Sequence, residues 1–295
     1  MTPPNVARPL TRFIALGLAS GMVACSEPPP QPTAAAAPAP QATQVTTRPS
    51  APAAGDPVWH YEGEEGPSNW GMLSPKFASC ASGRQQSPID ISSPGRGSGG
   101  EALKTNFSPA NLRIVHHDHM ADAINNGHTI QVNYSEGDTL TVGTTAYQLA
   151  QFHFHAPSEH TVNGKHFPME MHLVHKTSDG KLAVIGVLIA EGGANAAFEP
   201  IWANLPKQKG MEHHFANVKV DVDALLPTAR TTYRYDGSLT TPPCSEAVKW
   251  FVMTSPIALS AAQIGAFTSI IRGNNRPVQP LNGRAVVTDA LSGSD

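Results

Sequence analysis

Charge is scarce in this chain, and neither sign dominates. Of the 295 residues, 15% are charged, and the formal net charge at pH 7 is −3. A protein that binds nucleic acid or lies on an anionic membrane surface usually carries an excess of basic residues. The composition gives no argument for either partner, and we expect no nucleic-acid ligand.

The signatures of several enzyme classes are also missing. The chain contains no G-x-S-x-G motif for a serine nucleophile and no H-E-x-x-H motif for a metalloprotease. The glycine cluster GRGSGG, residues 95–100, lacks the preceding strand and following helix that a phosphate-binding loop needs. We interpret this cluster as a flexible surface connection. We also find no internal repeat.

Helical patterns are sparse, and short strand-like segments dominate beyond Trp59. The segment LAVIGVLIA, residues 182–190, is apolar throughout and predicts a strand buried on both faces. Turn sequences such as NNG, SEGD and TSDG separate the other segments. Strands are predicted at 123–134, 139–142, 149–155, 169–175, 182–190 and 247–254, and helices at 196–205 and 260–271, with Ser260 as an N-cap.

The N-terminal 25 residues have the pattern of an export signal. Arg8 and Arg12 precede the apolar stretch 13–23, which is too short to span a bilayer. The sequence Met-Val-Ala-Cys, residues 22–25, resembles a bacterial lipobox, which predicts lipidation of Cys25. The alternative is ordinary signal cleavage, which would release a soluble periplasmic or secreted protein. The expected location is the periplasm or the cell surface.

A proline- and alanine-rich segment at residues 26–57 follows the signal. It has almost no large apolar side chains and cannot form a core, so we expect a semi-rigid tether. One large domain is expected at 58–291, because all-β domains commonly reach about 200–250 residues, and 292–295 form a tail. With Cys25 accounted for, Cys80 and Cys244 can pair in an oxidising compartment, or stay as two buried free thiols.

Two stretches concentrate the histidines, namely QFHFHAPSEH at 151–160 and MEMHLVH at 169–175. Side chains alternate along a strand, so His153 and His155 leave one face, and Phe152 and Phe154 leave the other. A neighbouring strand can add His172. Three neutral imidazoles with an open fourth position are typical of catalytic zinc and indicate an enzyme that uses a metal-bound hydroxide.

A strand with a His-x-His pair can also simply present two polar residues to water. The phenylalanines beside the pair and the second histidine strand favour the metal site. His160 and His175 lie inside the apolar segments, and we expect them to be hydrogen-bonded structural histidines. The remaining histidines that we expect at the surface or in loops are His60, His116, His117, His119, His166, His213 and His214.

Seven ordered motifs make the region 58–291 resemble an α-class carbonic anhydrase. They are WHYEG, QSPIDI, INNGH, QFHFHAPSEHT, MEMHLVH, YDGSLTTPPCSE and NNRPVQPLNGR. The resemblance implies a mainly β (α+β) single domain with a large, mostly antiparallel central sheet, a few short peripheral helices and a conical active-site cleft. It also implies reversible hydration of carbon dioxide to bicarbonate and a proton.

The resemblance assigns a ligand set to one Zn²⁺ per chain. His153, His155 and His172 match the zinc ligands, and Gln151 and Glu170 match the groups that hydrogen-bond the outer nitrogens of those rings. Neutral ligands leave the charge of zinc undiluted, and in carbonic anhydrase itself the pKa of the bound water is about 7. The alternative for Gln151 and Glu170 is that they face water.

The resemblance also assigns the residues around the reacting oxygen. Thr240 matches the contact of the zinc-bound hydroxide, and Glu159 matches its partner. An ionised carboxylate only accepts, so the Thr240 hydroxyl donates to Glu159 and its lone pairs accept from the hydroxide. Without the resemblance, Thr240 would be interpreted as a turn residue. Cys80 and Cys244 match positions that are bridged in exported relatives.

The proton leaves, by the same resemblance, through His128, which matches the family's proton shuttle. Tyr61, Asn125 and Gln131 match positions that order the intervening waters. From pattern alone, His128 would be a solvated turn histidine, and the pocket residues would be ordinary core. The substrate pocket is expected to be lined by Val174, Val184, Leu239, Thr241 and Trp250.

Two other functional classes remain open from the sequence. A metal-carrying or adhesion lipoprotein could use three histidines without turnover, although non-catalytic relatives have typically lost one of them. A hydrolase is limited to promiscuous ester hydrolysis by the same hydroxide. The expected partners are carbon dioxide and bicarbonate, a membrane only through the lipid anchor, and, as an open alternative to the monomer, a second copy in a homodimer.

Overall fold

The structure is a computed structural model that describes residues 57–92, 95–96, 103–106, 110–117, 128–133, 137–210 and 212–293. All described residues belong to one compact unit within residues 47–295. Cys25, Asn125, His119 and most of the predicted tether therefore lie outside the described residues. Among the described helices, none is both long and apolar enough to cross a membrane.

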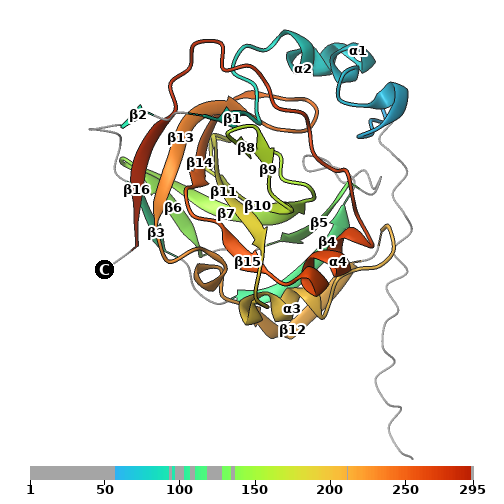
Figure 1. Ribbon diagram of the computed structural model, residues 1–295, viewed down its shortest axis with the longest axis vertical. Helices are drawn as coiled ribbons and strands as arrows, with labels where there is room; N and C mark the ends of the chain where they lie inside the picture. The colour runs from blue at the N-terminus through green and yellow to red at the C-terminus, as the bar shows by residue number, and fades with distance from the viewer. Residues whose placement is uncertain are drawn as a thin grey trace, which may run out of the picture. The chain divides into compact units, whose positions relative to one another are not determined.

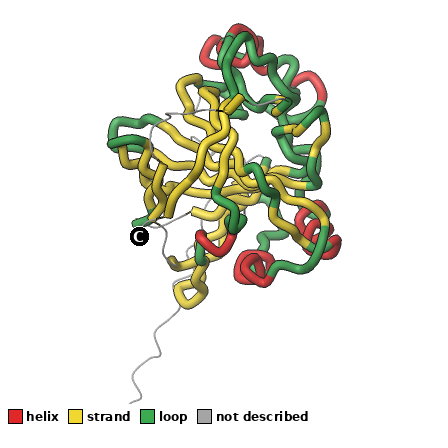
Figure 2. Tube along the Cα trace, turned by 60° about the vertical axis from the view of Figure 1, so that its left-hand side comes forward, coloured by secondary structure: helices red, strands yellow, loops and turns green. Residues whose placement is uncertain are grey.

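One mixed, mostly antiparallel sheet, with 13 strands among the described residues, organises the domain (Figures 1 and 2). Its main path runs β10-β11-β14-β13-β16-β3-β6-β7-β5-β4-β12, and an additional β7–β10 pairing joins the first strand of the path back to β7. β15 pairs with β11, and β2 pairs with β16. The strands are β2 (Gly95–Arg96), β3 (Leu103–Asn106), β4 (Ala110–His117), β5 (Thr129–Asn133), β6 (Thr139–Val142), β7 (Thr145–His155), β10 (Met169–Lys176), β11 (Leu182–Glu191), β12 (Glu212–Val220), β13 (Thr231–Ser238), β14 (Glu246–Met253), β15 (Ile257–Leu259) and β16 (Val287–Gly293).

The remaining elements are small. β1 (Asp90–Ile91), β8 (Thr161–Val162) and β9 (Lys165–His166) form a second sheet. Four short helices of the described chain are 3₁₀ helices, η1 (Gly63–Glu65), η2 (Pro75–Phe77), η3 (Ala196–Phe198) and η4 (Asp223–Leu225), and the α-helices are α1 (Trp70–Leu73), α2 (Ser79–Ser82), α3 (Glu199–Trp202) and α4 (Ala261–Thr268). Figure 2 shows the helices, in red, outside the strands.

β7 and β10 position the three predicted metal-binding histidines because each strand has one apolar face in the core and one face that carries these histidines. Phe152 and Phe154 on β7 are fully buried in the main apolar core, so the alternating residues His153 and His155 must project from the opposite face. In the antiparallel register His172 of β10 is paired with His153. The three strands β7, β10 and β11 lie side by side in Figure 1.

Most predicted elements are present, with shifted bounds. The fully apolar segment forms β11 and is buried at Ala183–Ile189, as predicted. The predicted helix 196–205 is instead a 3₁₀ turn followed by the four-residue α3, and the helix at 260–271 shortens to α4, whose Ser260 forms a capping box with Gln263. Of the predicted strand 123–134, the structure has β5, and His128 before it is not in a strand; residues 123–127 and 134 lie outside the described ranges.

Two parts of the sequence prediction need correction. The sequence predicts a loop for the glycine cluster, yet Gly95–Arg96 pair in parallel with Val287 and Thr288 of β16, because β3 pairs with β16 only at Leu291–Gly293 and leaves the earlier backbone groups available to another extended segment. The sequence does not predict the strands β3, β4, β12, β13 and β16, since their mixed polar and apolar residues lack a clear alternation.

A disulfide joins the N-terminal layer to the segment that follows β13. Cys80 of α2 and Cys244 are bonded, with Cα atoms 5.0 Å apart, which confirms the predicted pairing over two free thiols. Both cysteines pack with Trp59, Trp70 and Phe77 in a separate apolar cluster. The bond therefore ties the first described helices to the chain just after Thr240.

Candidate metal centre

Three buried imidazoles converge on the polar face of β7 and β10. The metal-binding atoms of His153, His155 and His172 all lie within 4.8 Å of one another, and each residue is about 1% exposed. Ring centroids are separated by 4.9 Å for His153–His155, 4.6 Å for His155–His172 and 5.3 Å for His153–His172. The predicted ligand set is therefore brought together in one place.

Each ring is held by a hydrogen bond to one of its two nitrogens. His153 Nδ1 lies 2.8 Å from Gln151 Oε1, and His172 Nε2 lies 2.9 Å from Glu170 Oε1. These are the two orienting contacts that the sequence predicts. Carboxamide and carboxylate oxygens accept, so the ring nitrogens in these bonds carry the protons.

The third ring is held by a residue to which the sequence reasoning gives no role. His155 Nδ1 lies 2.6 Å from the main-chain oxygen of Asn274. The side chain of Asn274 also accepts from the amide of Ala156 and donates to the carbonyls of His128 and Phe154. Asn274 opens the motif NNRPVQPLNGR, the only signal in the sequence that could have indicated it.

The inner nitrogens are left for an ion. With the outer nitrogens engaged, Nε2 of His153, Nε2 of His155 and Nδ1 of His172 face the common centre. The first two are buried without a hydrogen-bond partner. Buried polar atoms without partners are costly in a folded protein. These three neutral imidazole nitrogens match the donor set of Zn²⁺, so the residues present fit that ion.

The electrostatics of the site keep the rings neutral. Burial lowers the pKa of His155 to about 4 and the pKa of His153 well below its usual value, and the neighbouring imidazoles lower the pKa of His153 further. Burial also lowers the pKa of His172. A neutral ring keeps a lone pair for a metal, so these shifts favour ligation near neutral pH.

Glu170 is the most heavily engaged carboxylate of the site. Besides His172, its oxygens accept from His160 Nδ1 at 2.7 Å and from the amides of Glu159 and His160 at 2.9 and 2.8 Å. Burial opposes ionisation, but His160 and His172 lower the pKa of Glu170 well below its usual value. A Cβ on Gly186 would lie 3.0 Å from Glu170 Oε1, so glycine leaves room for this group.

His160 and His175 are hydrogen-bonded structural histidines, as the sequence indicates. His160 bridges Glu170 and the Tyr235 hydroxyl, and Tyr235 donates onward to Ser87. His175 Nδ1 lies 2.9 Å from the carbonyl of Leu173. Of the histidines expected at the surface, His60 and His166 are exposed, and the side chains of the others lie outside the described residues.

Glu159 links the triad to Thr240. Its Oε1 accepts from the amide of Arg276 at 2.8 Å, and its Oε2 lies 3.6 Å from His155 Nε2 and 3.8 Å from His172 Nδ1. Burial raises the pKa of Glu159 to about 7, against the opposing effects of His172, Arg276 and a hydrogen bond from Thr240. A divalent cation at the triad would favour the ionised carboxylate.

Arg276 is the second residue that the sequence reasoning misses. Its side chain is 1% exposed, and it donates to Gln86 Oε1 and to the carbonyls of Ser87 and Cys80. Its amide is the donor that holds Glu159. This one residue therefore connects the disulfide-bonded N-terminal layer to the carboxylate beside the triad.

Four of the five expected pocket residues fall into one apolar cluster next to His172. Val174, Val184 and Trp250 are buried together, and Leu239 packs against them. The ring of Trp250 lies 4.8 Å from that of His172 and its Nε1 donates to the carbonyl of Ser238. Thr241 is 5% exposed and accepts, through its carbonyl, from the Cys244 amide.

His128 lies beyond the triad, among aromatic rings. It is 6% exposed, and its ring centroid lies 3.6 Å from that of Trp59 and 5.4 Å from that of Tyr61. Gln131 of β5 is paired with His153 in the sheet, and its amide donates to Asn133. Burial and the Glu159 carboxylate raise the pKa of Tyr61 well above 10, so its hydroxyl stays neutral.

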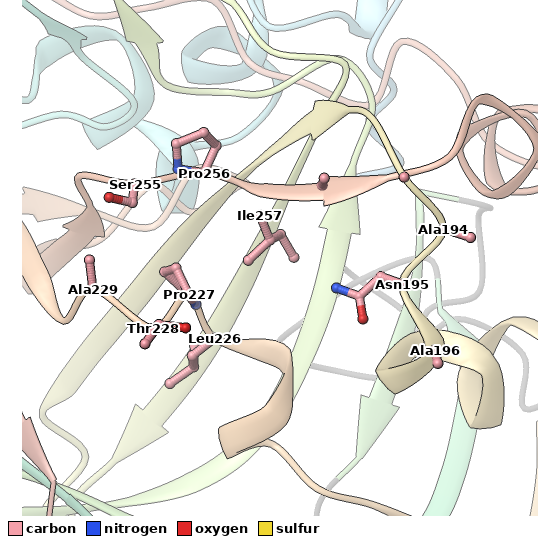
Figure 3. Close-up of a pocket in the computed structure, with 12 residues that line it drawn as sticks. Ala194, Asn195, Ala196, Leu226, Pro227, Thr228, Ala229, Ser255, Pro256 and Ile257 are labelled. Atoms are coloured by element: carbon pink, nitrogen blue, oxygen red, sulfur yellow. The ribbon is translucent and has the colours of Figure 1, made fainter.

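Two surface pockets of the described chain lie outside the triad. One, of about 430 Å³, is lined by residues that include His60, Glu62, His128 and Arg272. The other, of about 540 Å³, is formed by Asn195, Pro227, Ser255 and neighbours shown in Figure 3. None of the described residues that line the second pocket is ionisable, so we assign it no chemistry.

Comparison with known proteins decides the family. The model of the family described as eukaryotic-type carbonic anhydrase matches residues 65–290. The chain belongs to this family. It is 44% identical over 230 residues to a carbonic anhydrase of Pectobacterium carotovorum, a match that covers 78% of this chain and 90% of that protein.

Comparison with solved structures gives the same family. The chain superposes on the α-carbonic anhydrase of Thermovibrio ammonificans, in complex with the inhibitor sulfanilamide, with a TM-score of 0.71, 41% identity and coverage of 79% and 100% of the two chains. Dioscorin complexed with ascorbate is also similar, with a TM-score of 0.68, 29% identity and coverage of 79% and 98%. The predicted carbonic anhydrase fold and enzyme class are thus confirmed, and carbon dioxide and bicarbonate are its small-molecule substrates.

Proposed function

We propose that this carbonic anhydrase hydrates carbon dioxide reversibly with one zinc ion held by His153, His155 and His172. The observation that carries the proposal is the convergence of these three neutral nitrogens, each on a ring whose other nitrogen is fixed. A zinc ion supplies Lewis acidity that makes a water molecule nucleophilic near neutral pH; in carbonic anhydrase itself the pKa of that water is about 7.

Thr240 and Glu159 would orient the attacking oxygen. Glu159 accepts from the Arg276 amide and from the Thr240 hydroxyl, so the only proton of that hydroxyl is committed. The lone pairs of Thr240 then accept from the attacking oxygen and turn its own lone pair towards the substrate. Anions without a proton to offer Thr240 would bind less well.

The apolar residues beside His172 would bind carbon dioxide. Val174, Val184, Leu239 and Trp250 offer a wall of low polarity, which suits a small apolar molecule better than hydrogen-bond donors would. His128 would carry the released proton towards the surface, because an imidazole has one ring nitrogen that can accept a proton while the other releases one. Tyr61 and Gln131, and Asn125 outside the described residues, would order the intervening waters.

Metal analysis and stopped-flow kinetics test the proposal together. Purified protein should contain about one zinc per chain, and hydration measured with a pH indicator should be lost in His172→Ala and kept in His166→Ala, an exposed histidine outside the site. Equal rates for the wild type and His172→Ala would refute a metal-centred reaction. A protein that binds zinc tightly but shows no hydration would instead support the metal-carrier alternative.

The same nucleophile should hydrolyse activated esters slowly, as a side activity. Hydrolysis of p-nitrophenyl acetate should depend on zinc and disappear in His172→Ala. Ester hydrolysis that survives removal of the metal would place that activity elsewhere.

We propose further that the enzyme is exported and lipid-anchored through Cys25, with residues 26–57 as its tether. The support is the basic and apolar N-terminal pattern and the lipobox-like residues 22–25. Metabolic labelling with palmitate should mark the wild type and not Cys25→Ala. Release of an unlabelled wild-type protein into the periplasm would favour ordinary signal cleavage. Size-exclusion chromatography with light scattering distinguishes a monomer from the homodimer that we leave as an alternative.

A further inference from the structure

The pocket beside His128 contains a second histidine that the proposed reaction does not use. His60 is exposed, and its ring centroid lies 5.9 Å from that of the buried His128, with the two planes at 88°. Both rings line the same pocket of about 430 Å³. A single water, with hydrogen bonds of about 2.9 Å on each side, can bridge two imidazoles at this separation.

The main chain at His60 is fixed, so its side chain starts from a defined position. The amide of His60 donates to the carbonyl of Glu65 at 2.9 Å, and its carbonyl accepts from Trp70 Nε1 at 2.8 Å. The flanking residues Trp59 and Tyr61 pack edge-on against each other and both contact His128. The segment from Trp59 to Tyr61 therefore places the His60 ring at the surface and packs against the buried His128 ring.

The charged groups around the pocket are balanced. The Glu62 carboxylate lines it and lies near Gly273, where a Cβ would be 3.7 Å from Oε1. Arg272 is also on the lining of the pocket. Tyr61 remains neutral because burial raises its pKa. The lining of this pocket therefore brings one acidic and one basic side chain close to His60.

We infer that His60 is the outer station of the proton path, which receives protons from His128 and passes them to buffer. The inference rests on the proposed function, because it assumes that protons leave the metal centre through His128. A proton leaves a nitrogen of the His128 imidazolium, and the bridging water transfers a proton to a nitrogen of His60. His128 is then neutral, and the His60 imidazolium loses its proton to a buffer base at the surface.

His60→Gln tests this step, with His166→Gln as the matched control on another exposed histidine. In weak buffer, kcat of the zinc enzyme should fall about threefold in His60→Gln, a small part of what a positioned acid or base contributes, since water can still reach His128. The ratio kcat/KM, which does not contain the proton-exit step, should change less than twofold. High concentrations of imidazole buffer should remove the difference, and His166→Gln should match the wild type throughout.

An NMR titration gives a readout that does not depend on turnover. If the two imidazoles share protons, the titration curve of the His128 ring should shift in His60→Gln and stay unchanged in His166→Gln. Identical His128 titrations and identical kcat values in weak buffer would refute the relay while leaving carbon dioxide hydration intact. Absence of hydration by the wild-type zinc protein would refute the proposed function and, with it, this inference.

Discussion

Replacement of Glu170 with glutamine is the sharpest test of how the metal centre is held. The carboxylate is fully buried and accepts four hydrogen bonds, two from ring nitrogens of His172 and His160 and two from the amides of Glu159 and His160. Glutamine keeps the size and shape of the side chain. It replaces one accepting oxygen with a group that only donates.

The glutamine can take two orientations, and each has a different cost. If its NH₂ faces the two main-chain amides, two buried donors lose their acceptor. If its NH₂ faces the rings, His172 must accept at Nε2 and move its proton to Nδ1. That proton would occupy the nitrogen that faces the metal position, so the ring could no longer serve as a ligand in that tautomer.

The structure sets the size of the effect. Each buried donor left unpaired costs about 1–3 kcal/mol, so the first orientation destabilises the fold by about 2–6 kcal/mol. In a domain of this size, a loss of 2 kcal/mol lowers Tm by about 4–8 °C. Loss of an orienting partner typically weakens metal binding by about 10–100-fold.

Two measurements separate these outcomes. Competition with a chelator gives zinc affinity, and differential scanning calorimetry of the metal-free protein gives Tm. Glu191→Gln, at the exposed end of β11, is the control and should change neither. A Glu170→Gln protein with wild-type zinc affinity and wild-type Tm would refute the role we give to this carboxylate.

Three further predictions follow from the geometry. Thr240→Ala should lower the rate of hydration roughly 100-fold, the usual cost of losing a positioned hydrogen bond in a transition state. The active site of this variant should also bind anions that carry no proton. An unchanged rate in stopped-flow assays would refute the role of Thr240. The bond between Cys80 and Cys244 closes a loop of sequence separation 164. Replacing both cysteines by alanine should therefore lower the free energy of unfolding by about 5 kcal/mol, measured by urea titration with Cys25→Ala as the control. An unchanged free energy of unfolding would contradict this. Burial lowers the pKa of His155 and His175 to about 4, against about 6.5 in the unfolded chain. Between about pH 4 and about pH 6.5 the unfolded chain therefore binds more protons than the folded one, so the metal-free protein should lose stability as pH falls through this range. The dependence of stability on pH should be weaker in His175→Gln. Stability that does not change with pH in this range would contradict the assignment.

The two strands that carry the ligands, β7 and β10, could be predicted from sequence because their signals are local. Alternation along β7 places His153 and His155 on one face, and the alternating Phe152 and Phe154 identify the other face as core. The orienting groups Gln151 and Glu170 each lie two residues from the ring that they hold. A period of two fixes such pairs on the same face, whatever the rest of the fold does.

The rest of the site is held by contacts that no local pattern records. Asn274 holds His155 through a main-chain carbonyl, which every residue type possesses, at a separation of 119 residues. Arg276 reaches Glu159 through its amide and Ser87 through its guanidinium, again across long stretches of chain. The motif NNRPVQPLNGR contributes to the resemblance, but only the coordinates give these two residues their contacts.

The short stretch of sequence that carries the metal ligands has an evolutionary consequence. Residues 151–172, from Gln151 to His172, contain all three ligands and two of the groups that orient them, whereas Thr240 and Asn274 are supplied by later segments. A single recombination event can transplant the coordinating cassette between homologues as one block. The Thr240 hydroxyl and the Asn274 carbonyl come from downstream segments and do not travel with it, so chimeras should keep the ligands of one parent but depend on the other parent for Thr240 and for the group that orients His155.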